Sequence, residues 1–309
     1  MADADHTDAL ATLHDAGATR VPPWLALVSA LASVRPGSIG ETIDWLTAHR
    51  DELEHAYESG RTGPLRLAEV PRDMQYEPDL GYMDRTARVH YIRGRSLFKD
   101  LTKRSFYQSA IFAMTGLDLR ERDCELLDYL GTVNLLVDRH VWPMAATRRV
   151  AARGGGYSAA VVTGLAMMCS PMLAGEAAAG CARFLQRARA EAEAGGSVKA
   201  FVERILRDGE RVMGFGRPVV GPDERVPFMA DALERHGRLD LPFVTLLREV
   251  DQAFCAAKGL RSTSAAWAAA ALCDYGMNPE QVLAVSNYWV AVCVYSQALY
   301  SGERSVVRD

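Results

Sequence analysis

The peptide VMGFGRPVVGPDERV combines side chains and a backbone that could bind an anion. Arg217 and Arg225 each offer a planar set of N–H donors that suits a carboxylate or a phosphate. Gly214 and Gly216 would let the backbone approach such a group closely. The alternative for these arginines is an ordinary surface pairing with a neighbour such as Asp223. Because arginine keeps its proton at neutral pH, the peptide can hold or polarise an oxygen anion but cannot act as a base.

A second charged group stands in the peptide LLVDRHVWP, at the end of an apolar helical segment. Histidine titrates near neutral pH, so His140 could exchange a proton with a substrate. Asp138 could instead cap a helix end, and Arg139 could face solvent. The sequence leaves the pocket interpretation and the surface interpretation of these three residues open.

Gly154, Gly155 and Gly156 do not form a phosphate-binding loop. No strand signal precedes them, and no Lys-Ser or Lys-Thr pair follows them. We therefore expect them to form a turn between two helices.

The composition limits the classes of protein and partner. The chain has 309 residues, of which 49% are hydrophobic and 24% charged, as in a globular protein of one or two domains. A net charge of -4 without a basic stripe predicts no nucleic-acid partner. The absence of a signal-peptide pattern and of a long apolar run predicts a cytoplasmic protein with no membrane partner. The six cysteines lack C-x-x-C spacing, which predicts buried reduced thiols and no metal site.

Helical patterns dominate most of the chain. Ser197 and Asp123 each precede apolar residues at helical spacing, so both are expected to cap amphipathic helices. Asn278, Pro279 and Gln281 predict the start of a last, long helix. That helix is apolar on most sides, which implies deep burial or a subunit interface.

The scarcity of strand signals predicts the fold class. Strand signals are short, at residues 88–92 and 218–220, so the predicted class is all-α. Residues 60–86 are rich in proline, glycine and charge and are interpreted as a connector. Alanine-rich runs at residues 177–182 and 265–271 would allow helices to pack closely.

Five peptides stand in an order that resembles the citrate synthase superfamily. They are HYIRGRSLFKDLTKRSFYQSAIFAMTGLDL, LLVDRHVWPMAATRRVA, AAVVTGLAMMCSPMLAGEAA, ERVMGFGRPVVGPDERV and KGLRSTSAAWAAAALCDYGM. The similarity spans about residues 88–302, and its strongest part is GFG followed by Asp223 and Arg225. The short link before LLVDRH, and SPMLAGEAA in place of a histidine-glycine turn, resemble the citryl-CoA lyase-like branch.

The resemblance implies an all-helical homodimer whose subunits each close a large and a small domain over an acyl-CoA and a polycarboxylate. Carried onto this chain, it implies an N-terminal helical extension and connector at residues 1–87. A large helical domain would comprise residues 88–175 with 276–309, and a small helical domain residues 176–275. Gly214 and Gly216 would then lie against acyl-CoA, which is a substrate and not a permanently bound cofactor.

The resemblance also implies a reaction, but this sequence departs from its catalytic residues. In the family a carboxylate takes a proton from the acyl α-carbon, one histidine steadies the enolate oxygen, and another polarises a keto carbonyl. The two histidine positions correspond to Leu173 and Arg217, and the aspartate position corresponds to Ala265. None of the three catalytic side chains is kept.

The positions that bind the family's carboxylic acid differ as well. A substrate-binding histidine corresponds to Arg139, and two arginine positions fall near Ser286 and Tyr295. The residues expected to contact substrate are Asp138, Arg139, Asp223 and Arg225.

These substitutions favour a divergent citrate synthase-like or citryl-CoA lyase-like enzyme in which Arg217 assists the reaction. His140 or Glu176 would supply the base, or a malonyl-type thioester would yield its enolate by losing carbon dioxide. The alternative is a non-catalytic scaffold or ligand-sensing dimer, which the loss of all three catalytic side chains also favours.

Overall fold

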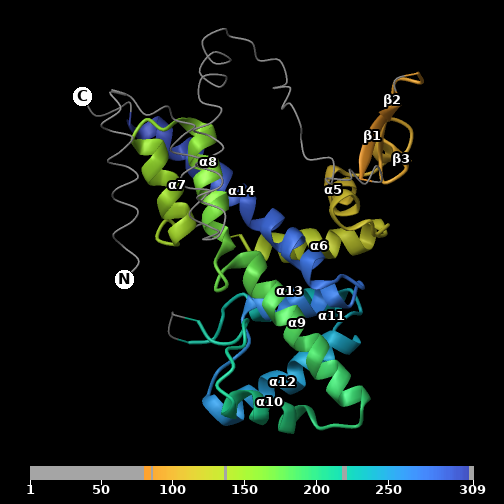
Figure 1. Ribbon diagram of the computed structural model, residues 1–309, viewed down its shortest axis with the longest axis vertical. Helices are drawn as coiled ribbons and strands as arrows, with labels where there is room; N and C mark the ends of the chain where they lie inside the picture. The colour runs from red at the N-terminus through yellow and green to blue at the C-terminus, as the bar shows by residue number, and fades with distance from the viewer. Residues whose placement is uncertain (1–79, 85, 136–137, 218–220, 306–309) are drawn as a thin grey trace, which may run out of the picture.

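The protein is described by a computed structural model over residues 80–84, 86–135, 138–217 and 221–305, with side chains through Tyr300 (Figure 1). These residues are mostly helical, which confirms the helical part of the expected fold class. The expected N-terminal extension lies largely outside them. The helices are α5 (Phe106–Thr115), α6 (Glu121–Val133), α7 (Trp142–Ala152), α8 (Gly156–Ala166), α9 (Ala174–Glu193), α10 (Val198–Arg207), α11 (Val226–Arg235), α12 (Pro242–Lys258), α13 (Ser264–Cys273) and α14 (Pro279–Ser305), with 3-10 turns η1 (Leu101–Lys103) and η2 (Met167–Cys169).

A small antiparallel sheet departs from the all-helical expectation. Its strands, in spatial order, are β1 (Gly81–Asp84), β2 (Val89–Ile92) and β3 (Arg95–Ser96). β2 confirms the strand signal at residues 88–92, whereas β1 lies in the segment 60–86, where only a connector was expected. β1 forms because it pairs with β2, and Tyr82 stacks on Tyr91 with ring centroids 4.9 Å apart. The other expected strand, at residues 218–220, lies outside the described residues.

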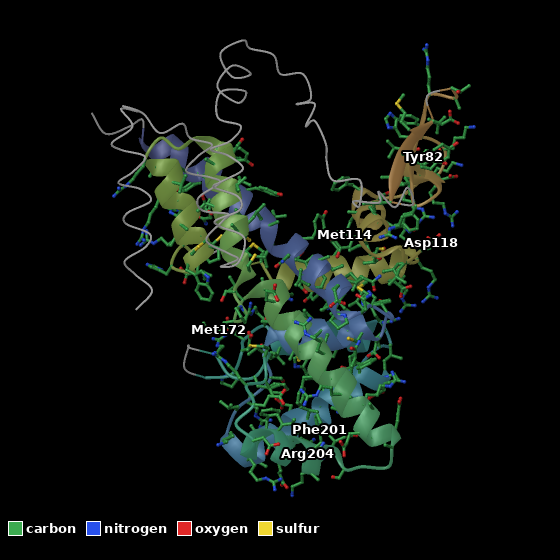
Figure 2. The ribbon with its side chains drawn as sticks, in the orientation of Figure 1. Tyr82, Met114, Asp118, Met172, Phe201 and Arg204 are labelled. Carbon is green, nitrogen blue, oxygen red and sulfur yellow. The ribbon has the colours of Figure 1, made fainter. Side chains whose placement is uncertain are left out.

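Asp118 connects this sheet to the helices through ion pairs (Figure 2). Its carboxylate accepts from Arg95 Nη2 at 3.0 Å and from Arg104 Nη1 at 2.7 Å. Arg95 belongs to β3, and Asp118 follows α5 in the chain. The ion pairs therefore hold the strands against the end of α5.

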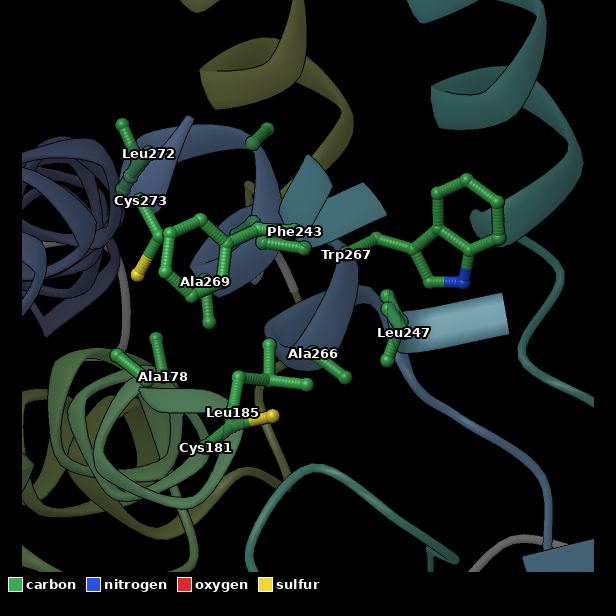
Figure 3. Close-up of a cluster of buried hydrophobic side chains, with 14 of the residues drawn as sticks. Ala178, Cys181, Leu185, Phe243, Leu247, Ala266, Trp267, Ala269, Leu272 and Cys273 are labelled. Atoms are coloured by element: carbon green, nitrogen blue, oxygen red, sulfur yellow. The ribbon is translucent and has the colours of Figure 1, made fainter. Parts of the chain in front are cut away.

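The larger hydrophobic core is built around the close approach of α9 and α13 (Figure 3). Ala178 and Cys181 of α9 face alanines of α13, and Leu185 fills the space beside them. The expected role of the two alanine-rich runs is confirmed, because small side chains let the two helix backbones pack tightly. Phe243 and Leu247 close the core from α12.

α14 connects this core to a second cluster (Figure 1). Its first half contributes Val282, Val285 and Trp289 to the larger core. Its second half packs against α7 and α8. Val292, Tyr295 and Leu299 stay exposed, so the expected deep burial holds for only part of the helix. The second cluster comprises Met144, Ala151, Ala160, Val161, Met168, Val290, Cys293, Val294 and Ala298.

Local capping signals were correct at two helices. Ser197 Oγ accepts the N–H of Ala200 at the start of α10, and Asn278 and Gln281 exchange two hydrogen bonds of 2.9 Å at the start of α14. The turn expected at residues 154–156 is also confirmed, because α7 ends at Ala152 and α8 begins at Gly156.

The expected cap at Asp123 is wrong. Helix α6 begins at Glu121, so Asp123 lies inside its first turn. There the side chain is buried and accepts from Arg120 at 2.8 Å and from the Tyr275 hydroxyl at 3.2 Å. Tertiary partners on other elements, which local sequence does not reveal, therefore determine the role of this carboxylate.

Two further expectations need correction. The segments 156–193 and 279–300 are long and apolar enough to span a membrane by length and composition, although buried core helices meet the same test. No apolar run of that length was expected. None of the six cysteines forms a disulfide, but Cys169 is exposed and Cys255 only half-buried, so burial holds for four of them.

Candidate functional site

A cavity of about 880 Å³ opens where five parts of the chain meet. They are the α6–α7 connection, the start of α9, the α10–α11 connection, the start of α13 and the middle of α14. Sites for small molecules commonly measure about 300–1,000 Å³, so the volume suits a small-molecule ligand.

The structure brings into this one cavity the three residues that the sequence resemblance places at the family's catalytic positions. Leu173 precedes the first turn of α9, Arg217 lies in the α10–α11 connection, and Ala265 lies in the first turn of α13. Ser286, from the middle of α14, lines the same space. Residues distant in the sequence therefore meet here, because α9, α13 and α14 pack against one another.

Other expected site residues divide into two groups. Those that line the cavity are Asp138, His140, Gly214, Gly216 and Arg225. Three others do not line it: Arg139 is exposed in the α6–α7 connection, Glu176 lies half-buried in the first turn of α9, and Tyr295 is exposed on α14. Asp223 lines a neighbouring hollow instead.

Asp223 organises the arginine-bearing connection. Its side chain is fully buried and accepts from Arg225 Nε and Nη2, both at 2.8 Å. The N–H of Ser264, at the start of α13, donates to the same carboxylate at 2.9 Å. One carboxylate thus fixes Arg225 and joins the connection to α13.

The pKa of Asp223 reflects these partners. Burial by itself raises the pKa of a carboxyl group, but hydrogen bonds from Arg225 and Ser264 outweigh it and lower the pKa from 3.8 to about 2. Asp223 is therefore ionised at neutral pH and acts as a fixed anchor. A carboxylate held in this way is a poor proton acceptor.

Arg217 keeps one donor for a ligand. Its Nη2 lies 2.6 Å from Glu224 Oε2, and its Nη1 lies 3.4 Å from Asp223 Oδ1. Its Nε is buried and has no hydrogen-bond partner among the described residues. Burying a donor without a partner is costly, so this N–H is suited to an oxygen atom of a bound molecule.

Glycines shape the connection before Arg217. Gly214 and Gly216 have φ values of 87° and 73°, a left-handed conformation that favours glycine. A side chain on Gly214 would meet Ala266 Cβ at 3.0 Å and Cys181 Sγ at 3.1 Å. Between the two glycines, Phe215 stacks on Phe254 with ring centroids 4.2 Å apart. Close packing of this connection against α9, α12 and α13 thus explains why these positions need glycine. The glycines are therefore no evidence in themselves for a bound ligand.

His140 and Asp138 form a hydrogen-bonded pair at the cavity edge. His140 Nδ1 and Asp138 Oδ1 lie 2.8 Å apart, and the backbone N–H of His140 donates to the same oxygen at 2.8 Å. These bonds lower the pKa of Asp138. Both side chains are exposed, at 76% and 65%. The arrangement leaves the histidine Nε2 directed away from the carboxylate, as in a general base oriented by an acid.

The structure adds a residue that sequence reasoning missed. Arg211 lines the cavity, and its Nη2 lies 2.9 Å from the sulfur of Met172, whose place is labelled in Figure 2. No carboxylate among the described residues pairs with Arg211. Only its place in the peptide that carries Arg217 could have indicated from sequence that Arg211 belongs to the site.

The hollow of about 360 Å³ lined by Asp223 adjoins the main cavity, with which it shares Gly216, Arg217 and Thr263. Residues 259–263, which connect α12 to α13, form its other side. The guanidinium of Arg217 therefore stands between two spaces that could hold two parts of one ligand.

Comparisons with known proteins agree with this architecture. Residues 86–288, more than half of the chain, match the family model described as citrate synthase, C-terminal domain. No curated protein matches the chain.

Solved structures share the fold at low sequence identity. Citryl-CoA lyase from Hydrogenobacter thermophilus is 18% identical with a TM-score of 0.64, over 74% of this chain and 87% of that one. ATP citrate lyase from Methanothrix soehngenii, in complex with citrate and coenzyme A, is 16% identical with a TM-score of 0.61, over 87% and 47%. Citrate synthase from Thermoplasma acidophilum, with carboxymethyl coenzyme A and oxaloacetate, is 15% identical with a TM-score of 0.53, over 66% and 55%.

Proposed function

This chain belongs to the citrate synthase superfamily, and we propose that it makes or breaks a carbon–carbon bond between an acyl-CoA and a carboxylic acid in the cavity. The observation that carries the proposal is Arg217, a largely buried guanidinium with an unpartnered Nε at one of the family's catalytic histidine positions. The relatives crystallised with citrate, coenzyme A, carboxymethyl coenzyme A and oxaloacetate support the substrate classes.

Arg217 acts through electrostatics. In the condensing direction, an acyl α-carbon loses its proton and the resulting enolate attacks a carbonyl carbon, whose oxygen becomes negatively charged. In the cleaving direction the same bond breaks and the enolate is released. A charged N–H donor beside either oxygen anion lowers the barrier, and removing such a donor costs about 100-fold or more in rate.

His140 is the proposed proton acceptor. Its bond to Asp138 holds the imidazole at the cavity edge, and histidine can accept a proton at neutral pH. Glu176 does not line the cavity. A malonyl-type thioester would need no base, because loss of carbon dioxide leaves the electron pair of the broken bond on the α-carbon as the enolate.

The acyl-CoA is proposed to lie along Gly214 and Gly216, with Arg217 between its acyl group and the neighbouring hollow. We expect it to be a substrate that leaves after each turnover, without a permanently bound cofactor. Arg225 stays a candidate substrate contact through Nη1, the guanidinium nitrogen that Asp223 does not hold.

The proposal also includes the expected domain boundaries, oligomeric state, compartment and partners. The large domain would comprise residues 88–175 with 276–309, and the small domain residues 176–275. The working form would be a cytoplasmic homodimer with small-molecule ligands and no nucleic acid or membrane partner.

A second candidate is a non-catalytic scaffold or ligand-sensing dimer. The observation that favours it is the apolar character of Leu173 and Ala265, which occupy two of the three catalytic positions in the cavity. Such a protein would bind the ligands and change shape without turnover.

Arg217→Gln separates the two candidates. Acetyl- and malonyl-CoA are incubated with a panel of 2-oxo acids, and citryl-CoA is incubated alone. Mass spectrometry then measures the acyl-CoA that is formed or consumed. We expect wild-type turnover, a loss of about 100-fold in Arg217→Gln, and no loss in Arg248→Gln, which removes a half-exposed arginine outside the cavity. Binding of acyl-CoA without turnover in the wild type would favour the sensor.

A further inference from the structure

Charge is unevenly distributed around the cavity. Its charged lining residues among those described come from two connections: Asp138 and His140 from α6–α7, and Arg211, Arg217 and Arg225 from α10–α11. The walls that α9, α13 and α14 contribute carry no charged side chain in the described part of the lining. A ligand would thus meet charged side chains only from the two connections and uncharged side chains from the helices.

The helical wall is largely apolar. The apolar residues that it presents are Leu173, Ala174, Ala177, Ala178, Ala265, Ala268, Trp289 and Val290. The indole N–H of Trp289 donates to the Tyr107 hydroxyl at 2.7 Å, so this N–H already has a hydrogen-bond partner. A carboxylate placed against this wall would lose its hydration without gaining a charged partner, which is strongly unfavourable.

Ser286 interrupts the apolar wall. The residue is 5% exposed, and its Oγ is buried with no hydrogen-bond partner among the described residues. Thr263, another hydroxyl in the lining, differs because its Oγ1 donates to the Gly214 carbonyl at 3.1 Å. Buried hydroxyls are normally satisfied, so Ser286 Oγ points to a ligand oxygen.

We propose that the acid bound in this cavity is an aliphatic monocarboxylic acid that carries one further oxo or hydroxy oxygen, rather than a di- or tricarboxylic acid. Its carboxylate binds Arg211, which no carboxylate among the described residues holds, and its second oxygen binds Ser286 Oγ. Its hydrocarbon part lies on the helical wall, and Arg217 Nε is left for the oxygen anion formed in the reaction. The inference rests on the proposed function, since it names the acid for the same site. It differs from the citrate and oxaloacetate of the crystallised relatives.

Calorimetric titration of the full chain with matched pairs of acids tests the class of ligand. The pairs are 2-oxopentanoate with 2-oxoglutarate, and 2-oxohexanoate with 2-oxoadipate, each with coenzyme A present. We expect the monocarboxylates to bind more tightly, with about a fourfold gain for the added methylene. Equal or tighter binding of the dicarboxylates, or no binding by any of the four acids, would overturn the proposal.

Ser286→Ala tests the second contact. Removing a buried, unpartnered hydroxyl should raise the melting temperature by about 2 °C and weaken 2-oxopentanoate binding about fivefold. Ser296→Ala is the matched control on the same helix, because Ser296 is exposed and its Oγ donates to the Val292 carbonyl. Unchanged affinity, or a lowered melting temperature, in Ser286→Ala would overturn the contact.

The same titrations keep the two proposals apart. Tight binding of the monocarboxylates without any turnover of acyl-CoA would support this inference and contradict the proposed function. If acyl-CoA is turned over with a dicarboxylate that binds more tightly than the matched monocarboxylate, the proposed function is supported and this inference is contradicted.

Discussion

Asp223 determines which donors the arginine peptide can offer to a ligand. Its carboxylate is occupied by two nitrogens of Arg225, the N–H of Ser264 and the more distant Nη1 of Arg217. The Asp-x-Arg pair that this chain keeps is thus a support for the connection before α11. Because Asp223 lies near Arg217 Nη1 and Glu224 pairs with Nη2, the unpartnered Nε of Arg217 becomes the donor of interest.

Asp223→Asn should change the dependence of stability on pH. The pKa of Asp223 is lowered from 3.8 to about 2 in the folded state, so its contribution is complete above pH 3.8 and is lost as pH falls toward 2. That contribution is about 2 kcal/mol. Urea unfolding of the wild type should therefore show a steeper loss of stability in this range than Asp223→Asn. Asp240→Asn, at a highly exposed carboxylate, is the control and should follow the wild type.

His140→Gln distinguishes the two routes to an enolate. If His140 accepts the α-proton, turnover of acetyl-CoA should fall about 100-fold, whereas decarboxylation of malonyl-CoA should be unaffected. The control is His236→Gln, because His236 bonds the Ala232 carbonyl at the end of α11 and does not line the cavity. Equal acetyl-CoA turnover in the wild type and His140→Gln would exclude His140 as the base.

Sequence reasoning anticipated part of the site at this scale. It identified Arg217 and His140 because a charged residue in a glycine-rich or helix-ending peptide stands out locally. It missed Arg211 and could not show that Ser286 lacks a hydrogen-bond partner. Those features depend on the approach of α9 and α14 to the α10–α11 connection, which no local pattern encodes.

The crossing of α9 and α14 is the element-scale feature that shapes the cavity wall. Gly175, at the start of α9, donates its N–H to Asn287 Oδ1 of α14 at 3.0 Å. This places Leu173 beside the part of α14 that carries Ser286. The absence of a side chain at Gly175 permits the close approach, since an added Cβ would lie 2.5 Å from the Leu283 carbonyl oxygen.

Gly175→Ala should therefore separate the two helices and disturb the wall. We expect a loss of about 2 kcal/mol in the free energy of unfolding, as in other overpacked cores, together with weaker ligand binding. Chemical denaturation and calorimetric titration would measure both effects. Gln186→Ala, on the exposed side of α9, should change stability by no more than about 0.5 kcal/mol. A stable Gly175→Ala protein with unchanged affinity would show that the crossing tolerates a methyl group.

Elements with local signals were predictable, and elements made by distant partners were not. Ser197 and the Asn278–Gln281 box define helix starts through hydrogen bonds within four residues. β1 depends on pairing with β2, and Asp123 depends on Arg238 and Tyr275, which lie more than a hundred residues away in sequence. The same limit applies to the cavity, whose position follows from packing rather than from any peptide.

At the scale of the whole molecule, one face of α14 exposes apolar side chains in the described part of the chain. Val292, Tyr295 and Leu299 are 50%, 42% and 60% exposed, and their spacing places them on one side of the helix. A second copy of this chain would cover such an apolar stripe, as the proposed homodimer requires.

Leu299→Glu should weaken that homodimer. A charge within an apolar interface loses hydration without gaining a partner, so light scattering should show a shift from dimer toward monomer at micromolar concentration. Lys199→Glu, an exposed charge change on α10, should leave the mass unchanged. A wild-type protein that is monomeric throughout this range would contradict the dimer.

The most direct test of the central claim is deuterium uptake at the acyl α-carbon in heavy water, because both proposed routes pass through an enolate. Acetyl-CoA or malonyl-CoA is incubated with the full chain and 2-hydroxypentanoate, which offers the enolate no carbonyl to attack, so that solvent must reprotonate it. The acetyl group of the thioester is then analysed by mass spectrometry. We predict deuterated acetyl groups with the wild type and uptake about 100-fold slower with Arg217→Gln. Uptake no faster than in the absence of protein would contradict the catalytic account.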